Sequence, residues 1–245
     1  MLLGEPPRSQ ADLHFSLLGI PVRVHWSFWL VAALLGLRRQ DPMLLLIWVA
    51  AVFVSIVVHE LGHALIARVH GAQPWITLYS FGGLASYNPT RHDTTSRILI
   101  TAAGPGAGFL FAGFLLAAIH ASGHPVSLQR VGYFIWPTYP GFDSFHLEVL
   151  LGDLLFVNIL WGVINLMPIY PLDGGQIARE LLVRLNPYEG IRQSLLISIV
   201  FAAGMAVFGF VVWGSIFVAL MFGYLAYGSY AALQMTSGRG GPFGW

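Results

Sequence analysis

Long apolar runs separated by short polar stretches make up most of the chain. A helix that crosses a membrane needs about 20 mainly apolar residues. The last run is about twice that length, so we divide it into two helices that turn near Phe210–Ser215. The pattern therefore predicts six membrane-spanning helices, drawn from the runs Val24–Leu37, Met43–Val69, Ile98–Ala121, Leu150–Leu172 and Leu195–Met235.

The composition favours a membrane protein. Of the 245 residues, 56% are hydrophobic and 9% are charged, and the mean hydropathy is +0.71. A soluble domain carries about 25% charged residues, so a globule of this composition could not cover its surface. The net charge of +1 gives no reason to expect a nucleic-acid partner. The chain has no cysteine, which excludes disulfide scaffolds, Cys-ligated zinc and Cys nucleophiles.

We therefore expect an all-α polytopic membrane protein, with a single transmembrane domain over residues 1–236 and a flexible tail at 237–245. The polar N-terminus lacks the apolar stretch and the cleavage site of a signal peptide. Arginines gather in cytoplasmic loops of membrane proteins. They are more frequent on the side that holds the N-terminus than on the opposite side, where we place Arg38, Arg39 and Arg130.

This asymmetry predicts cytoplasmic N- and C-termini and a site toward the cytoplasmic leaflet. The expected location is the inner (plasma) membrane of a prokaryote.

Three ionisable side chains interrupt the second run, whose residues 53–67 read FVSIVVHELGHALIA. His59 and His63 are four residues apart and lie on one face of a helix, where both imidazoles can reach one Zn²⁺ at about 2.0–2.1 Å. Glu60 is placed to act on the attacking water, in the His-Glu-x-x-His pattern of zinc peptidases. Ionisable residues inside a membrane are costly and usually functional. The alternative is that the three side chains only bond neighbouring helices.

A second polar segment, NLMPIYPLDGG at Asn165–Gly175, ends the fourth run. Pro168 and Pro171 break the helix, and Gly174–Gly175 permits a turn. Two His ligands are fewer than the usual three. Asp173 lies about as deep as the His pair, at 1.5 Å per residue from the far-side start of each run. We therefore predict that Asp173 is the third ligand. The alternative is a turn in which Asp173 caps the following helix.

These motifs resemble the site-2 protease family of intramembrane zinc metalloproteases. The similarity includes GIPVRVHWSFWL at Gly19–Leu30, the FGGLASY stretch and AAGPGAG at Ala102–Gly108, and it covers most of the chain from Gly19 to Gly175. Many members have Asn where this chain has Gly108. We therefore assign Gly108 no site role and interpret it as small-residue helix packing.

The resemblance implies that His59, His63 and Asp173 ligate one Zn²⁺ per chain, that Glu60 is the general acid/base, and that Asn165 helps to polarise the scissile carbonyl. It implies an intramembrane endopeptidase that cleaves in or near a transmembrane segment of a membrane-protein substrate. No stretch resembles the PDZ or nucleotide-sensing modules of some members. The alternatives are a zinc transporter and a non-catalytic binding module that use the same ligands, and Glu60 disfavours transport because transport needs no such carboxylate.

The stretch TLYSFGGLASY at Thr77–Tyr87 predicts two short strands with Gly82–Gly83 as their turn. A helical substrate hides its peptide bonds in its own hydrogen bonds, so a protease must hold it extended. An exposed strand edge would do so by β-augmentation. The alternative is an ordinary interfacial loop.

Overall fold

The computed structural model describes residues 5–80, 82–88, 93–132 and 134–236, which divide into two compact units. The first unit takes its described residues from 5–88 and 104–162, and the second from 93–103 and 163–236. Helix α3 (Thr94–Ala121) contributes residues to both units. So does the helical stretch formed by α4 (Phe145–Phe156), the π-helical turn η1 (Val157–Trp161) and α5 (Gly162–Asn165).

Two capped helices begin the helical part of the first unit. In α1 (Trp26–Gly36) the N-cap His25 accepts a hydrogen bond from the backbone N–H of Ser27. In α2 (Pro42–Val69) the N-cap Asp41 accepts from the N–H of Met43, and Pro42 occupies the first position, where its missing donor is harmless. With 28 residues, α2 is long enough to cross a membrane.

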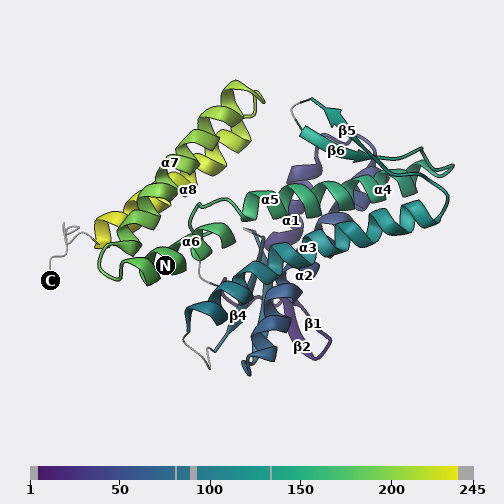
Figure 1. The fold of residues 1–245 in the computed structure, drawn as a ribbon. Helices are drawn as coiled ribbons and strands as arrows, with labels where there is room; N and C mark the ends of the chain where they lie inside the picture. The colour runs from purple at the N-terminus through teal and green to yellow at the C-terminus, as the bar shows by residue number, and fades with distance from the viewer. Residues whose placement is uncertain (1–4, 81, 89–92, 133, 237–245) are drawn as a thin grey trace. The chain divides into compact units, whose positions relative to one another are not determined.

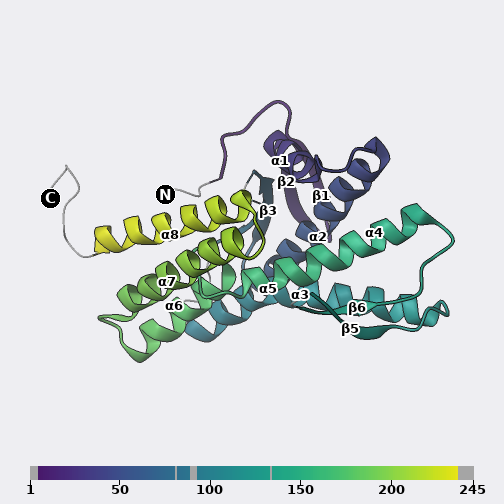
Figure 2. The ribbon, with the colours of Figure 1, turned by 90° about the horizontal axis from the view of Figure 1, so that it is seen from above.

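A four-stranded sheet completes the core of the first unit. Its strands, in the order β1-β2-β3-β4, are β1 (Leu13–Leu17), β2 (Ile20–Val24), β3 (Pro74–Tyr79) and β4 (Gly82–Tyr87). The β1–β2 and β3–β4 pairs are antiparallel, whereas β2 and β3 are parallel. A parallel pair needs a long crossover, and here α1 and α2 supply it (Figure 2). Strand β4 is therefore an edge strand of the sheet.

Buried apolar side chains join this sheet to α1 and α2. Val24, Ile76 and Leu78 are completely buried, and they share one core cluster with Phe28 of α1 and Ile56 of α2. Burying an aliphatic or aromatic side chain contributes about 1.5–3 kcal/mol. The cluster therefore holds the middle of α2 against the sheet. A separate hairpin, β5 (Ser127–Val131) with β6 (Phe134–Thr138), lies between α3 and α4 in the chain.

The second unit is helical. It contains α6 (Asp173–Leu185), α7 (Gly190–Val211) and α8 (Ile216–Thr236), and α7 and α8 lie side by side as an antiparallel pair (Figure 1). The turn between them contains Gly214, whose φ of +60° suits glycine, and Ser215, whose hydroxyl accepts from the N–H of Val218. This places the turn where the sequence predicted it, near Phe210–Ser215, and that prediction is confirmed.

Within the described ranges, five helical segments are long and apolar enough to cross a membrane: α2, α3, the stretch from α4 to α5, α7 and α8. The chain is thus a mostly helical integral membrane protein. The predicted first span, Val24–Leu37, is shorter in the structure, since α1 has 11 residues and Val24 belongs to β2. The count of six spans is therefore not confirmed. Alternating burial of the branched Val22 and Val24 with partly exposed neighbours is typical of a strand.

The predicted hairpin turn at Gly82–Gly83 is wrong. Tyr79 pairs with Gly82, so both glycines belong to β4, and Phe81 lies outside the described residues. Strands β1, β2, β5 and β6 were not predicted, and the amphipathic helix α6 was considered only in the alternative in which Asp173 caps a following helix. The single domain over residues 1–236 stays a prediction, and the tail at 237–245 lies outside the described residues.

Candidate metal centre

Helix α2 brings two imidazole rings together inside the first unit. His59 and His63 lie one turn apart, and their Nε2 atoms are 3.2 Å from each other. Two nitrogen ligands at 2.0–2.1 Å from a tetrahedral zinc ion are about 3.3–3.4 Å apart. Both side chains are buried. The rings therefore already have the spacing that a shared zinc ion requires.

Glu60 completes a compact group with the two histidines. One ligand atom from each of the three residues lies within 4.8 Å of the others, and Glu60 is 5% exposed. Elsewhere in the described ranges, no other group of three His, Cys, Asp or Glu side chains has this spacing. A buried carboxylate beside two imidazoles is stabilised by a cation. The donor set of this group fits a zinc ion.

Two glycines bring neighbouring elements very close to this group. A Cβ atom at Gly104 of α3 would overlap the imidazole of His63, and a Cβ atom at Gly83 of β4 would overlap the carboxyl group of Glu60. Only a hydrogen atom fits at either position. The sequence pattern predicted a turn at Gly83 and indicated no role for Gly104. The signal that points to Gly104 is its spacing of four residues from Gly108, which puts both glycines on one face of α3.

The other two predicted site residues lie in the second unit. Asn165 is the last residue of α5 and Asp173 is the first residue of α6; both are buried. The predicted break of the fourth run after Asn165 is confirmed, because α5 ends there and α6 begins at Asp173. The N-cap position of α6 is taken by Leu172. Asp173 therefore does not cap a helix that starts at Gly174.

The non-helical segment before Asp173 is hydrogen-bonded to α7 and α8. The N–H of Tyr170 donates to the hydroxyl of Ser198 (3.0 Å), and the hydroxyl of Ser229 donates to the carbonyl of Tyr170 (3.2 Å). The neighbouring Ile169 is completely buried in a cluster with Phe222. Irregular backbone at membrane depth must find such partners within the protein. The two serines therefore stabilise the segment that carries Asp173.

The Gly174–Gly175 pair packs against that same segment. A Cβ atom at Gly174 would overlap the carbonyl of Leu166, and one at Gly175 would overlap the backbone of Ile169. The first turn of α6 therefore lies directly on the non-helical segment, which requires glycine at both positions.

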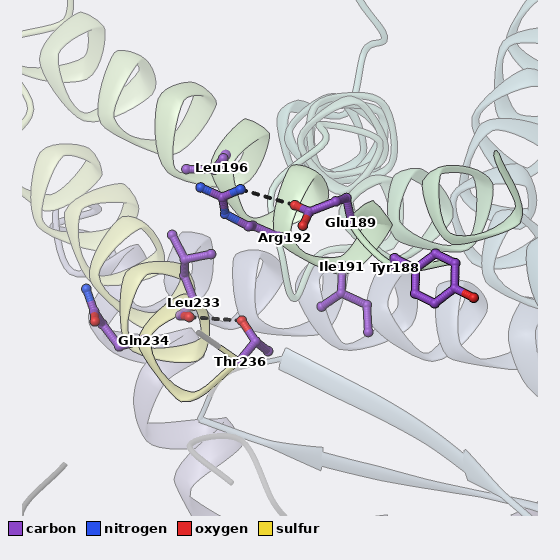
Figure 3. A pocket seen from close by; sticks show the side chains of 8 residues that line it. All are labelled: Tyr188, Glu189, Ile191, Arg192, Leu196, Leu233, Gln234 and Thr236. Carbon is purple, nitrogen blue, oxygen red and sulfur yellow. Dashed lines mark hydrogen bonds and ion pairs between the residues drawn. The ribbon is translucent and has the colours of Figure 1, made fainter. Parts of the chain in front are cut away.

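A cavity of about 710 Å³ in the second unit is separate from these residues (Figure 3). Within it, Arg192 donates to Glu189 at 3.1 Å and the hydroxyl of Thr236 donates to the carbonyl of Leu233 at 2.9 Å. None of the five predicted site residues lines it. Its lining is Tyr188, Glu189, Ile191, Arg192, Leu196, Leu233, Gln234 and Thr236.

Comparisons with known proteins agree with a zinc site. The family model described as Peptidase family M50 matches residues 47–141 and 143–207. The chain is 32% identical to a protein of Synechocystis sp. that carries a zinc metalloprotease name, over 72% of this chain and 46% of that protein. It is 29% identical to a zinc metalloprotease of Methanocaldococcus jannaschii, over 71% of this chain and 46% of that protein. The chain thus matches about half the length of these relatives.

The fold is similar to that of the solved site-2 protease from Methanocaldococcus jannaschii. The TM-score is 0.59, the identity is 23%, and the match covers 91% of this chain and 95% of the other. This likeness concerns the arrangement of helices and strands.

The contact at Gly104 generates a test of the metal site. We expect Gly104→Ala to weaken zinc binding about tenfold or more, because the added methyl group displaces the imidazole of His63 and second-sphere changes cost about 10–100-fold in metal affinity. Competition with a chromophoric chelator measures the affinity. Gly113→Ala is the matched control on α3, since a Cβ atom there would meet no described heavy atom within 4 Å apart from its own chain neighbours and the nearby backbone of α3. Unchanged zinc affinity in Gly104→Ala would contradict the assignment of His63.

Proposed function

Because the chain belongs to Peptidase family M50, we propose that it is an intramembrane zinc endopeptidase, which hydrolyses a peptide bond in or near a transmembrane segment of another membrane protein. The observation that carries this proposal is the buried group of His59, Glu60 and His63. That group lies on a helix apolar enough to cross a membrane. A protease whose catalytic group lies within the membrane meets its substrates there.

His59 and His63 would hold one zinc ion per chain, with Asp173 as the third ligand. A catalytic zinc ion usually has three protein ligands, and there is no cysteine to supply one. Two other carboxylates in helices already pair with arginines, since Asp153 accepts from Arg39 and Glu180 accepts from Arg97. When bound, zinc would polarise the scissile carbonyl and lower the pKa of its water toward about 7.

Glu60 would take a proton from the attacking water and return it to the leaving amine. General acid–base catalysis by one side chain contributes about 10²–10⁴-fold to the rate. The close approach of Gly83 confines the carboxyl group of Glu60, which limits its possible orientations. Asn165 would donate a hydrogen bond to the oxygen that becomes negative during the attack, a contact worth about 10²–10³-fold.

Strand β4 would hold the substrate in an extended form. It is an edge strand, and its Gly83 contacts Glu60 within the same unit. A substrate segment that adds to the edge of β4 would gain backbone hydrogen bonds in exchange for those of its own helix. Its peptide bonds would then be exposed beside the proposed general base.

The expected location is the inner membrane of a prokaryote, and the arginine distribution supports cytoplasmic N- and C-termini. The site would then face the cytoplasmic leaflet. A reporter fused after Trp245 that is active only when exported would contradict this orientation.

Cleavage of single-span substrates tests the function. We expect purified protein in detergent to cut some members of a panel of single-span peptides, and a zinc chelator to abolish the cleavage. Glu60→Gln should lower the rate by about 10²–10⁴-fold while zinc stays bound, because this residue acts on the water. The readouts are mass spectrometry of the products and metal analysis. Zinc lost together with activity would contradict the role of Glu60, and zinc bound without any cleavage would favour a transporter or a binding module.

Proline substitutions test the role of β4. N–H groups alternate in direction along a strand, so one of the two neighbours Leu84 and Ala85 directs its N–H toward the free edge of β4. Proline removes that donor, and we therefore expect at least one of Leu84→Pro and Ala85→Pro to reduce cleavage strongly. Zinc content should stay unchanged in both. Leu84→Ala and Ala85→Val are the matched controls, which keep the donors. If the controls lose as much activity as the proline variants, side-chain packing explains the effect and substrate pairing is wrong.

A further inference from the structure

A buried asparagine in the first unit has one half of its amide group fully bonded. Asn158 belongs to the π-helical turn η1 and is 3% exposed. Its Nδ2 donates to the hydroxyl of Ser55 and to the carbonyl of Leu154, both at 2.8 Å. A backbone carbonyl can only accept, so Nδ2 must face Leu154 and Oδ1 must face away from it.

The other half of the amide has no protein partner. Among the described residues, no group donates a hydrogen bond to Oδ1 of Asn158, although this atom is buried. An unpaired buried acceptor is costly, and native proteins usually satisfy such atoms with protein groups or ordered water. Turns of π-helix are rare and often occur at functional sites. A small hydrogen-bond donor next to Oδ1 of Asn158 would therefore stabilise the protein.

The space that such a donor would occupy lies beside Gly108 of α3. At the point where a Cβ atom of Gly108 would sit, the distance to Oδ1 of Asn158 and to its backbone oxygen is 3.5 Å each. Apart from the adjoining residues of α3, no other described heavy atom lies within 4 Å of that point. Oδ1 and the backbone oxygen of Asn158 therefore both lie near this side of Gly108, and two acceptors close together are the environment that a buried water molecule needs.

We propose that Gly108 and Asn158 form a binding site for one buried water molecule, which donates to Oδ1 and to the backbone oxygen of Asn158. That carbonyl already accepts from the N–H of Gly162 and has a second lone pair for the water. The water would lie between α3 and η1. Gly108 has no side chain that could bond Asn158 directly, so the water would supply the hydrogen bonds at this point. The site lies outside the proposed zinc ligands and goes beyond the proposed function.

The water site adjoins the metal centre along two helices. Ser55, which holds Nδ2 of Asn158, precedes His59 by one turn of α2. Gly108 follows Gly104 by one turn of α3, and Gly104 is the residue that packs on His63. A bridge between Gly108 and Asn158 therefore keeps α3 in the position that its contact with His63 requires.

A methyl group at position 108 distinguishes a water site from dry packing. Its contacts at 3.5 Å are ordinary van der Waals distances, so alanine fits without a clash. If the space were only a packing contact, Gly108→Ala would raise stability, because alanine favours a helix more than glycine does. If water occupies the space, the methyl group displaces it and leaves Oδ1 of Asn158 unpaired, which lowers stability.

The experiment measures thermal unfolding of the full chain in detergent, without substrate. We expect Gly108→Ala to lower the Tm by about 3–6 °C, whereas Gly113→Ala on the same helix should leave it equal or higher. Gly108→Ser should recover most of the loss, because its hydroxyl group can donate to Oδ1 of Asn158 in place of the water. In an Asn158→Leu background, Gly108→Ala should no longer lower the Tm, since the acceptor is gone.

Three results would overturn the proposal. A higher Tm in Gly108→Ala than in the unchanged protein would mean that the space is a dry packing contact. An unchanged Tm together with a raised KM for a single-span peptide would mean that the donor comes from the substrate instead of from water. A Tm that falls equally in Gly108→Ala and Gly108→Ser would also contradict it, because the hydroxyl group would then have no effect.

Discussion

An ionisable group in an apolar medium costs several kcal/mol unless it is paired, and this constraint governs the middle of helix α2. His59, Glu60 and His63 lie together on that helix, all of them buried. The apolar residues around them join α2 to the sheet. A metal ion is the partner that suits two imidazoles 3.2 Å apart with a carboxylate beside them.

The same constraint explains where glycine and serine are used. Gly83 and Gly104 let β4 and α3 approach the buried group so closely that no side chain would fit. In the second unit, Ser198 and Ser229 form hydrogen bonds with the backbone N–H and carbonyl of Tyr170. This residue lies between α5 and α6, where the backbone makes no helical hydrogen bonds. The backbone polar groups of Tyr170 thus find partners within the protein, and tight packing at Gly83 and Gly104 keeps the buried group in place.

The parts of the fold that depend on neighbouring residues could be predicted from the sequence. Hydrophobic runs indicated most of the long helices, and Pro168 and Pro171 indicated the break after Asn165. A spacing of four residues was enough to place His59 and His63 on one helix face.

Features that depend on distant residues could not be predicted. The parallel pairing of β2 with β3 joins segments about 50 residues apart, so no local pattern reveals it. Gly83 resembled a turn residue because glycine is common in turns, but it pairs with Leu78 in β4, where the nearby carboxyl group of Glu60 leaves no room for a side chain. Helix α6 was missed because it carries too few apolar residues to resemble a span. The role of Asp173 as a ligand remains a prediction from motif, depth and resemblance.

X-ray absorption at the zinc edge tests the central claim most directly, namely that two histidines of α2 and an aspartate of a separate segment bind one metal ion. For the purified protein we predict two imidazole ligands and at least one carboxylate oxygen at about 2.0–2.2 Å. Asp173→Asn should lose the carboxylate contribution and most of the zinc, whereas the control Glu180→Ala, which removes only a pairing partner of Arg97, should keep both. Full zinc occupancy and an unchanged spectrum in Asp173→Asn would contradict the account.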